Sequence, residues 1–207
     1  MKQSAVKYAI TMLCFGMSVV LLSSCGFLDN LINDSETAKP HINGKTVNMK
    51  DPAVLNNDTL VYGYTPLRGN YTYIQMNPSK AVMEMTPLLC GDGVFCFPPL
   101  EKDMSFQLIY FSYEAIGDFG GTVINRFTPG IGSDGNIAFI VKEAGLQFLG
   151  AYAFAADKAR SAAAFKPYPK EDQKNYELKC LRTMQPVFKG SKWEAAIAKR
   201  IEELENE

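Results

Sequence analysis

The sequence predicts a mainly β fold, an antiparallel β-sandwich with a C-terminal amphipathic helix packed on it. Short runs rich in β-branched and aromatic residues recur about every ten residues and are bounded by Gly, Pro, Asn and Asp. Ten Tyr and thirteen Phe supply large groups that suit strands and a buried core. Because no helical pattern separates these runs, a parallel α/β fold is disfavoured.

Length and charge limit the classes of protein. The chain carries 21 Lys and Arg against 22 Asp and Glu, so it lacks the basic surface that phosphate binding requires. A nucleic-acid partner is therefore not expected. Residues 25–207 are long enough for one ordinary domain with a sizeable core, and two full domains are not expected.

Residues 1–24 have the layout of a cleaved secretory signal peptide. Lys2 and Lys7 form a basic start, an apolar run follows, and Ser23 and Ser24 are small residues at its end. The apolar run has about 15 residues, whereas about 20 are needed to span a bilayer as a helix. A cleaved leader therefore fits better than the alternative, an uncleaved signal anchor with a chance cysteine.

The next residue is Cys25, and Leu22-Ser23-Ser24-Cys25 resembles the lipobox of bacterial lipoproteins. The resemblance implies that a diacylglyceryl group is attached to the Cys25 sulfur, that the leader is removed, and that the new amino terminus receives a fatty acid such as palmitate. Several acyl chains bury enough methylene groups to hold a soluble domain on a membrane. By the sorting rule of enteric lipoproteins, the resemblance with Gly26 in place of Asp implies the outer membrane. We expect a lipid-anchored protein of the bacterial cell envelope.

Residues 25–58 are rich in Asn, Asp, Ser, Thr, Lys and Pro, and we interpret them as the lipidated N-terminus and a flexible tether. An ordered strand or short helix is the alternative. The single histidine, His41, falls in this range. A catalytic imidazole must be held rigidly by a third group, so we interpret His41 as a solvated bystander. We assign no catalytic residue and no metal ligand.

The β-sandwich domain is predicted over residues 59–185. Its strands are expected at 59–64, 71–76, 80–85, 93–97, 105–113, 122–127, 136–141, 146–154 and 175–183. The Ala-rich segment 155–174 is predicted to be an exposed excursion between the last two strands, with Pro167 and Pro169 ending any helical turn.

The segment "GDGVFCFPPLEKDMSFQLIY" resembles part of the transthyretin-like and carboxypeptidase-regulatory-like sandwich modules. Its matching residues are Asp92, Gly93, Val94, Phe95, Phe97, Pro99, Leu100, Phe106 and Leu108. The chain has Glu101-Lys102-Asp103-Met104 where those modules usually have Pro-Gly. The resemblance covers residues 59–150 and implies a non-catalytic binding or structural module.

The last segment, residues 186–207, is predicted to contain an amphipathic helix. Ser191 and Glu194 fit a capping box, and Trp193, Ile197, Ile201 and Leu204 form one apolar stripe. We expect this helix to pack on the sandwich. Docking on a partner protein is the alternative.

Three cysteines fall in the predicted domain. Cys90 and Cys96 flank a Gly-Asp-Gly turn and could form a disulfide in an exported protein, whereas Cys180 is expected to be a buried small apolar residue. The turns at 91–93 and 132–136 hold one Asp each, too few for a calcium loop. Tyr62, Tyr64, Tyr71 and Tyr73 lie on two neighbouring strands and are candidates for an exposed stacking face.

These observations predict a non-catalytic lipoprotein that binds a protein or a polysaccharide or has a structural role in the envelope, with no cofactor. One alternative is an envelope hydrolase that uses two carboxylates. The other is an accessory subunit that docks through the C-terminal helix. The sequence identifies no ligand.

Overall fold

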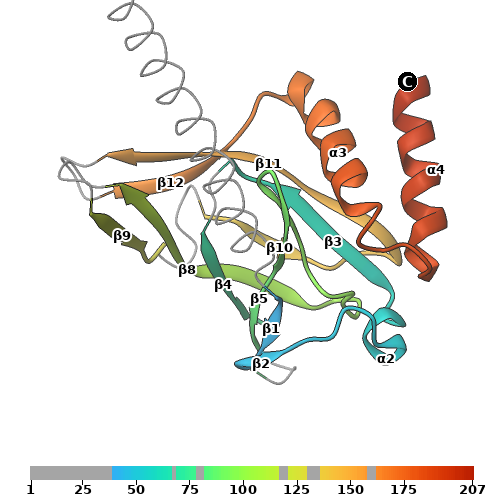
Figure 1. Ribbon diagram of the computed structural model, residues 1–207, viewed down its shortest axis with the longest axis horizontal. Helices are drawn as coiled ribbons and strands as arrows, with labels where there is room; N and C mark the ends of the chain where they lie inside the picture. Colours follow the sequence, from blue (N-terminus) through green and yellow to red (C-terminus); the bar gives the residue numbers. More distant parts are fainter. Residues whose placement is uncertain (1–38, 67–68, 78–81, 117–120, 130–135, 158–161) are drawn as a thin grey trace, which may run out of the picture. The chain divides into compact units, whose positions relative to one another are not determined.

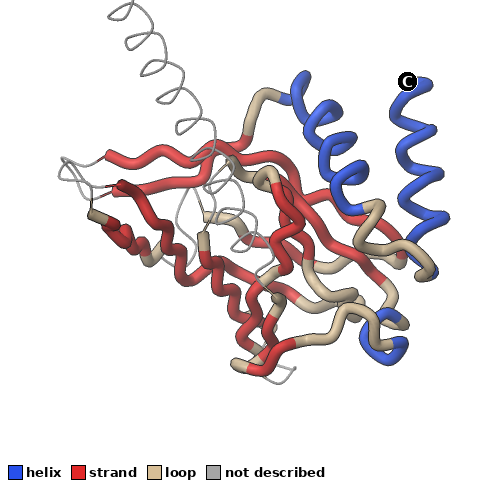
Figure 2. Tube along the Cα trace, in the orientation of Figure 1, coloured by secondary structure: helices blue, strands red, loops and turns tan. Residues whose placement is uncertain are grey.

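The structure is a computed structural model that describes residues 39–66, 69–77, 82–116, 121–129, 136–157 and 162–207. All of these residues lie in one compact unit, Ala38–Glu207. Over them the chain is mainly β and ends in a helix, as the sequence predicts (Figures 1 and 2). No helix within the described ranges is long and apolar enough to cross a membrane.

The described strands form two sheets. The larger sheet is antiparallel and has the order β10-β8-β4-β5-β1-β2, with β9 also paired to β8. Its strands are β1 (His41–Ile42), β2 (Lys45–Thr46), β4 (Asn70–Gln75), β5 (Glu84–Thr86), β8 (Ser105–Ile116), β9 (Thr122–Phe127) and β10 (Ala138–Ile140).

The smaller sheet has the order β12-β11-β3-β7-β6. Its strands are β3 (Thr59–Tyr64), β6 (Leu88–Gly91), β7 (Val94–Cys96), β11 (Gly145–Asp157) and β12 (Ala162–Pro167). β3 and β11 are parallel, with Thr59 opposite Gly145, whereas every pairing was predicted to be antiparallel. This sheet is therefore mixed. β6 was not predicted.

One hydrophobic cluster draws side chains from both sheets, and we call it the aromatic cluster. The larger sheet contributes Tyr71, Tyr73 and Phe111, and the smaller sheet contributes Phe95 and Phe97, all of them buried. Tyr73 meets Phe97 edge to face with 4.9 Å between ring centroids, a favoured arrangement for aromatic pairs.

The opposite face of the smaller sheet is covered by helices α3 (Lys170–Met184) and α4 (Lys192–Asn206), which lie next to each other (Figure 1). Side chains of these helices and of the sheet form a second hydrophobic cluster, which we call the helix-side cluster. Leu60, Tyr62 and Tyr64 of β3 face it, whereas Val61 faces the aromatic cluster. Because both faces of β3 are covered, all six of its residues are buried.

Two predictions near the C-terminal end were wrong. Residues 175–183 belong to α3 rather than to a strand, because Cys180, Leu181 and Met184 follow helical spacing and become the buried face. Glu171 and Asp172 lie in the first turn, where negative charge stabilises the helix dipole. Residues 162–167, predicted to be part of an exposed excursion, form β12 and pair with β11.

Helix α4 confirms the predicted amphipathic helix, and it begins at Lys192, directly after the predicted cap Ser191. Ser191 Oγ accepts a hydrogen bond from the backbone N–H of Trp193, and Glu194 accepts one from the N–H of Gly190, one residue earlier than in a standard capping box. Trp193, Ile197 and Leu204 are buried in the helix-side cluster.

The described part of the predicted tether is ordered. β1 pairs with β5 as well as with β2, and the short helix α2 (Pro52–Leu55) begins after Asp51, which caps it. His41 lies in β1, where its backbone N–H donates to Thr86 Oγ1 at 3.0 Å. The interpretation of His41 as part of a flexible tether was therefore wrong, because sheet pairing fixes its backbone.

Candidate functional site

The structure describes only some of the predicted sites. Cys25 and the leader lie outside the described residues, as do positions 132–135 of the second predicted turn. Within the described ranges, no cluster of three His, Cys, Asp or Glu side chains could hold a metal ion.

The predicted tyrosine face is not exposed. Tyr71 and Tyr73 are buried in the aromatic cluster, whereas Tyr62 and Tyr64 are buried on the helix side. Both faces of β3 are covered, and alternation along β4 turns Tyr71 and Tyr73 to the same, buried face. The prediction of an exposed stacking face on these strands was wrong.

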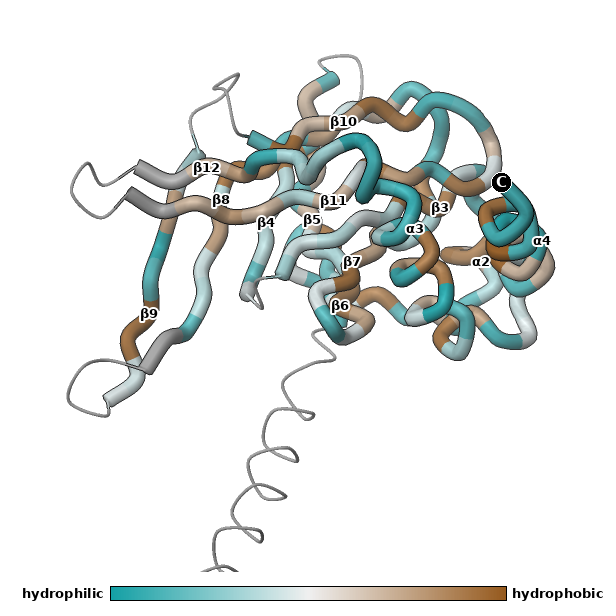
Figure 3. Tube along the Cα trace, turned by 90° about the horizontal axis from the view of Figure 1, so that it is seen from above, coloured by the Kyte–Doolittle hydropathy of each residue, from teal (hydrophilic) through white to brown (hydrophobic). Residues whose placement is uncertain are grey.

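A different group of aromatic rings reaches solvent where the β8–β9 and β11–β12 hairpins run past the end of β3. Tyr113, Phe127 and Phe154 are partly buried here, and Phe111 and Phe165 lie beneath them. We call these five residues the aromatic end. In Figures 1 and 3 the two hairpins lie on the opposite side of the molecule from α4.

The rings of the aromatic end bridge the two hairpins. Phe127 of β9 lies 5.0 Å from Phe154 of β11, and Phe154 lies 5.1 Å from Phe165 of β12, measured between ring centroids. Tyr113 and Phe127 are almost parallel, with 8° between their planes and 6.0 Å between their centroids. The end of the core is thus formed by rings from two separate hairpins, which meet one another edge to face.

Strand β9 continues this surface as a sheet edge. Among the described strands it pairs only with β8, along all six of its residues. Val123 is 47% exposed and Ile124 is 52% exposed, so both sides of the strand show a large β-branched side chain to solvent. An edge strand offers unpaired backbone N–H and C=O groups, to which another strand can bond.

This arrangement is suited to binding. The aromatic end supplies rigid, flat apolar groups, and β9 supplies backbone donors and acceptors beside them. Tyr113 is the only ionisable residue of the aromatic end, so its five residues contain no acid–base pair. The signal for β9 was present in the sequence as the β-branched run Thr122-Val123-Ile124 within 122–127, and the structure confirms that strand. Its edge position could not be found from the sequence alone.

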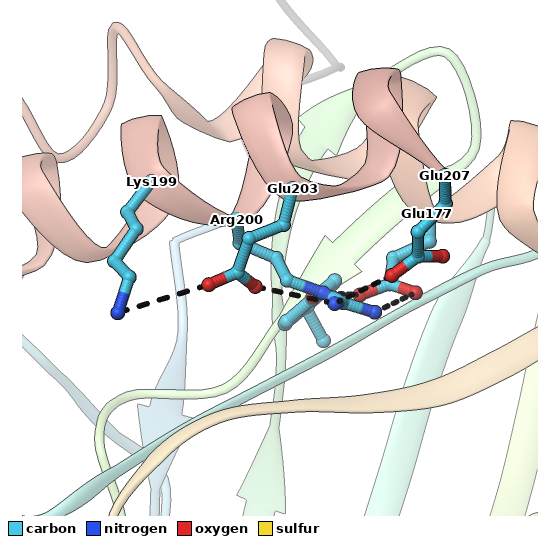
Figure 4. A network of polar contacts seen from close by, with 6 residues as sticks. Glu177, Lys199, Arg200, Glu203 and Glu207 are labelled. Atoms are coloured by element: carbon cyan, nitrogen blue, oxygen red, sulfur yellow. Dashed lines mark hydrogen bonds and ion pairs between the residues drawn. The ribbon is translucent and has the colours of Figure 1, made fainter.

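A polar network joins the two long helices (Figure 4). The Arg200 guanidinium on α4 donates to both oxygens of Glu177 on α3, at 2.9 Å from Nε and 3.2 Å from Nη2. Tyr62 on β3 donates to the same carboxylate at 3.1 Å, and Glu203 approaches Arg200 at 3.3 Å. Hydrogen bonding to Glu177 raises the pKa of Arg200, and burial raises that of Tyr62. The carboxylate therefore holds the helices on β3.

A third group of rings surrounds the start of α3. Tyr176 stacks on Tyr64 at 4.6 Å and on Tyr168 at 4.5 Å, and Lys179 Nζ lies 4.8 Å from the centre of the Tyr64 ring. Desolvation and a hydrogen bond with Tyr168 raise the pKa of Tyr176 to about 12. These rings cover one another and a lysine, so we interpret the group as structural packing.

The two cysteines predicted to pair are close in space. Cys90 Sγ lies 3.5 Å from Cys96 Sγ across the β6–β7 hairpin, and both are free thiols in the structure. Cys180, predicted to be a buried apolar residue, is buried on α3 in the same helix-side cluster. Burial raises its pKa well above the usual range for a thiol, so it remains protonated.

Comparison with known proteins adds no relative: no protein-family model, no curated protein and no solved structure matches this chain.

Proposed function

We propose that this protein is a bacterial envelope lipoprotein, anchored through a lipid on Cys25, that binds a partner protein through strand β9 and the aromatic end. The leader and the lipobox-like Leu22-Ser23-Ser24-Cys25 support the anchor. The exposed edge of β9 next to partly exposed rings supports the binding role, and this is the observation that carries the proposal. The role is non-catalytic.

A protein partner is favoured over a polysaccharide because β9 offers backbone groups in addition to apolar ones. An extended segment of the partner would add to the larger sheet next to β9, with alternate side chains against Val123 and Ile124. The apolar face of α4 is already buried through Trp193, Ile197 and Leu204, so we place the docking surface on β9 and not on that helix.

We further propose that the two sheets pack as a β-sandwich, with the aromatic cluster as its core and the helices on the outer face of the smaller sheet. The ring contacts between sheets support this, as between Tyr73 and Phe97. A double-mutant cycle with Leu at both positions should give a coupling of about 0.5–1.5 kcal/mol, the usual value for an aromatic pair. A coupling of zero would contradict the packing.

Site-specific photocrosslinking in membranes tests the binding surface. A benzophenone amino acid is placed at Val123 or Ile124, and at Glu202 on the exposed side of α4 as the matched control. We expect a crosslinked partner protein from β9 and none from position 202. Crosslinks from all three sites, or from none, would argue against β9, and recovery of a polysaccharide in place of a protein would refute the added strand.

The anchor is tested separately. The Cys25→Ala variant should keep its leader and fail to incorporate labelled palmitate, whereas Cys180→Ala should be processed and labelled like the wild type. Equal labelling of the Cys25→Ala protein would show that the lipid is attached elsewhere.

A further inference from the structure

The β6–β7 hairpin brings the thiols of Cys90 and Cys96 close together. Cys180, the third cysteine in the described residues, lies on α3. Leu88 pairs with Cys96 and Leu89 with Phe95, and the register then shifts so that Cys90 sits in a bulge before the Gly91–Gly93 turn. Alternation along β6 places Leu88 and Cys90 on the helix-side face, where Cys96 also lies. Their sulfur atoms are 3.5 Å apart.

The two thiols differ in their access to solvent. Cys96 is completely buried, whereas Cys90 is partly exposed on β6, the last strand of the smaller sheet. A hydrogen bond to Cys90 and burial both raise the pKa of Cys96, so it stays protonated in the reduced pair. Cys180 approaches the same region from α3, next to β6 and β7 in Figure 3.

We propose that Cys90 and Cys96 form an intramolecular disulfide by exchange with a disulfide oxidant made of two thiols, such as oxidised glutathione, and that Cys90 reacts first. Cys90 lies diagonally across the hairpin from Cys96, which pairs with Leu88. Their sulfur atoms are nevertheless only 3.5 Å apart, so a small movement of the side chains brings them to the bonded separation of about 2.0 Å. The inference does not depend on the partner proposed above.

The exchange has two steps. The Cys90 thiol loses its proton and its sulfur attacks one sulfur of the oxidant, so that the oxidant's S–S bond breaks and one thiolate leaves and takes up a proton. Cys96 then gives up its proton and attacks Cys90 Sγ in the mixed disulfide, and the oxidant leaves as its second thiol. Two electrons and two protons pass from the cysteine pair to the oxidant.

The bond would fix an edge of the smaller sheet. Its loop encloses the turn in which Gly91, Asp92 and Gly93 all have left-handed φ values of 100°, 51° and 81°. These conformations leave the turn dependent on its flanking strands. A covalent link between β6 and β7 therefore keeps the turn and the edge strand in register.

Peptide mapping tests the proposal on the full-length protein purified in detergent. The protein is equilibrated with oxidised glutathione, denatured, alkylated and digested with trypsin. Residues 81–102 contain both cysteines and no internal Lys or Arg, whereas Cys180 falls in a separate peptide. We expect peptide 81–102 to be unalkylated and two hydrogens lighter than its reduced form, while the Cys180 peptide carries the alkyl group.

The consequence for stability gives a second measurement. Reduction of the oxidised protein should lower its Tm by roughly 5–9 °C, from the loop entropy of a short disulfide and the size of the domain. Cys180→Ala is the matched control and should keep this shift, whereas Cys96→Ser should abolish it. Double alkylation of peptide 81–102 after oxidation, or a crosslink from either cysteine to Cys180, would overturn the assignment.

Discussion

The side chain of Gln173 completes the smaller sheet beside β11 where the pairing of β11 with β12 ends, at Tyr152 opposite Pro167. Beyond Phe148 the register of β11 against β3 shifts, and Gly150 adopts a left-handed φ of 114°. Gln173 Oε1 accepts from the backbone N–H of Ala151 at 2.8 Å. Its Nε2 donates to the carbonyl oxygens of Tyr168 at 2.8 Å and of Ala151 at 3.3 Å. One amide side chain on α3 thus takes the place of a neighbouring strand.

Replacing Gln173 with Ala should destabilise the domain by about 2–4 kcal/mol. Ala151 is fully buried, so its N–H would lose its partner at a cost of about 1–3 kcal/mol, and the bond to Tyr168 contributes about 1 kcal/mol more. For a domain of this size the Tm should fall by roughly 5–15 °C. Guanidinium chloride unfolding measures the free energy, and amide exchange should show faster exchange at Ala151.

Two variants serve as controls. Gln173→Glu keeps an acceptor for the Ala151 N–H but sets a carboxylate oxygen against the carbonyl oxygens of Tyr168 and Ala151, so stability should fall although the Ala151 N–H keeps a partner. Asn175→Ala, at an exposed position of the same helix, should stay within about 0.5 kcal/mol of the wild type. If Gln173→Ala unfolds at the same denaturant concentration as Asn175→Ala, the side chain does not complete the sheet.

Three further predictions concern other parts of the domain. Arg200→Ala should cost about 1–3 kcal/mol in the free energy of unfolding, because Glu177, whose side chain is only 12% exposed, loses two charged hydrogen bonds; Lys199→Ala is the exposed control, and equal effects would contradict this role. Gly93→Ala should destabilise more than Gly91→Ala, since both positions have positive φ but only at 93 would a Cβ lie 2.2 Å from the Thr65 carbonyl oxygen; unfolding midpoints for the pair measure the difference, and equal losses would remove the clash as its cause. The raised pKa of Tyr176, about 12, means that the folded state holds this proton more tightly than the unfolded chain; stability should therefore be constant below the ordinary tyrosine pKa of about 10 and fall between there and about 12. Alkaline unfolding of Tyr176→Phe should show a weaker loss over that interval, and an unchanged pH profile would refute the assignment.

Local pattern was sufficient where short runs of β-branched and aromatic residues are bounded by turn residues. Strands 59–64 and 122–127 were predicted with the bounds that the structure shows. The capping residues Ser191 and Glu194 located the start of the last helix, although Glu194 bonds the N–H of Gly190 and not that of Ser191. In each case the information lies within a few neighbouring residues.

The errors arose where short-range pattern was ambiguous. Tyr176, Leu178 and Cys180 alternate as in a strand, but the buried positions 180, 181 and 184 reveal the helical period. The Ala-rich segment before Phe165 has little β propensity, and it becomes a strand because β11 provides a partner.

The candidate site could be predicted only in part. The proximity of Cys90 and Cys96 followed from their spacing around a turn. The aromatic end could not be predicted, because Tyr113, Phe127 and Phe154 come from three strands that meet only in the folded sheet arrangement. Exposure of the β9 edge depends likewise on which strand, β8, takes the inner position.

The parallel pairing of β3 with β11 has a consequence for the order of folding. Thr59 finds its partner only when Gly145 is present, and loop closure between such distant residues is slow compared with hairpin formation. The smaller sheet thus cannot close until the whole chain between β3 and β11 is present. For the exported protein that we propose, this sheet can therefore close on the far side of the membrane only after residue 145 of the 207 has crossed.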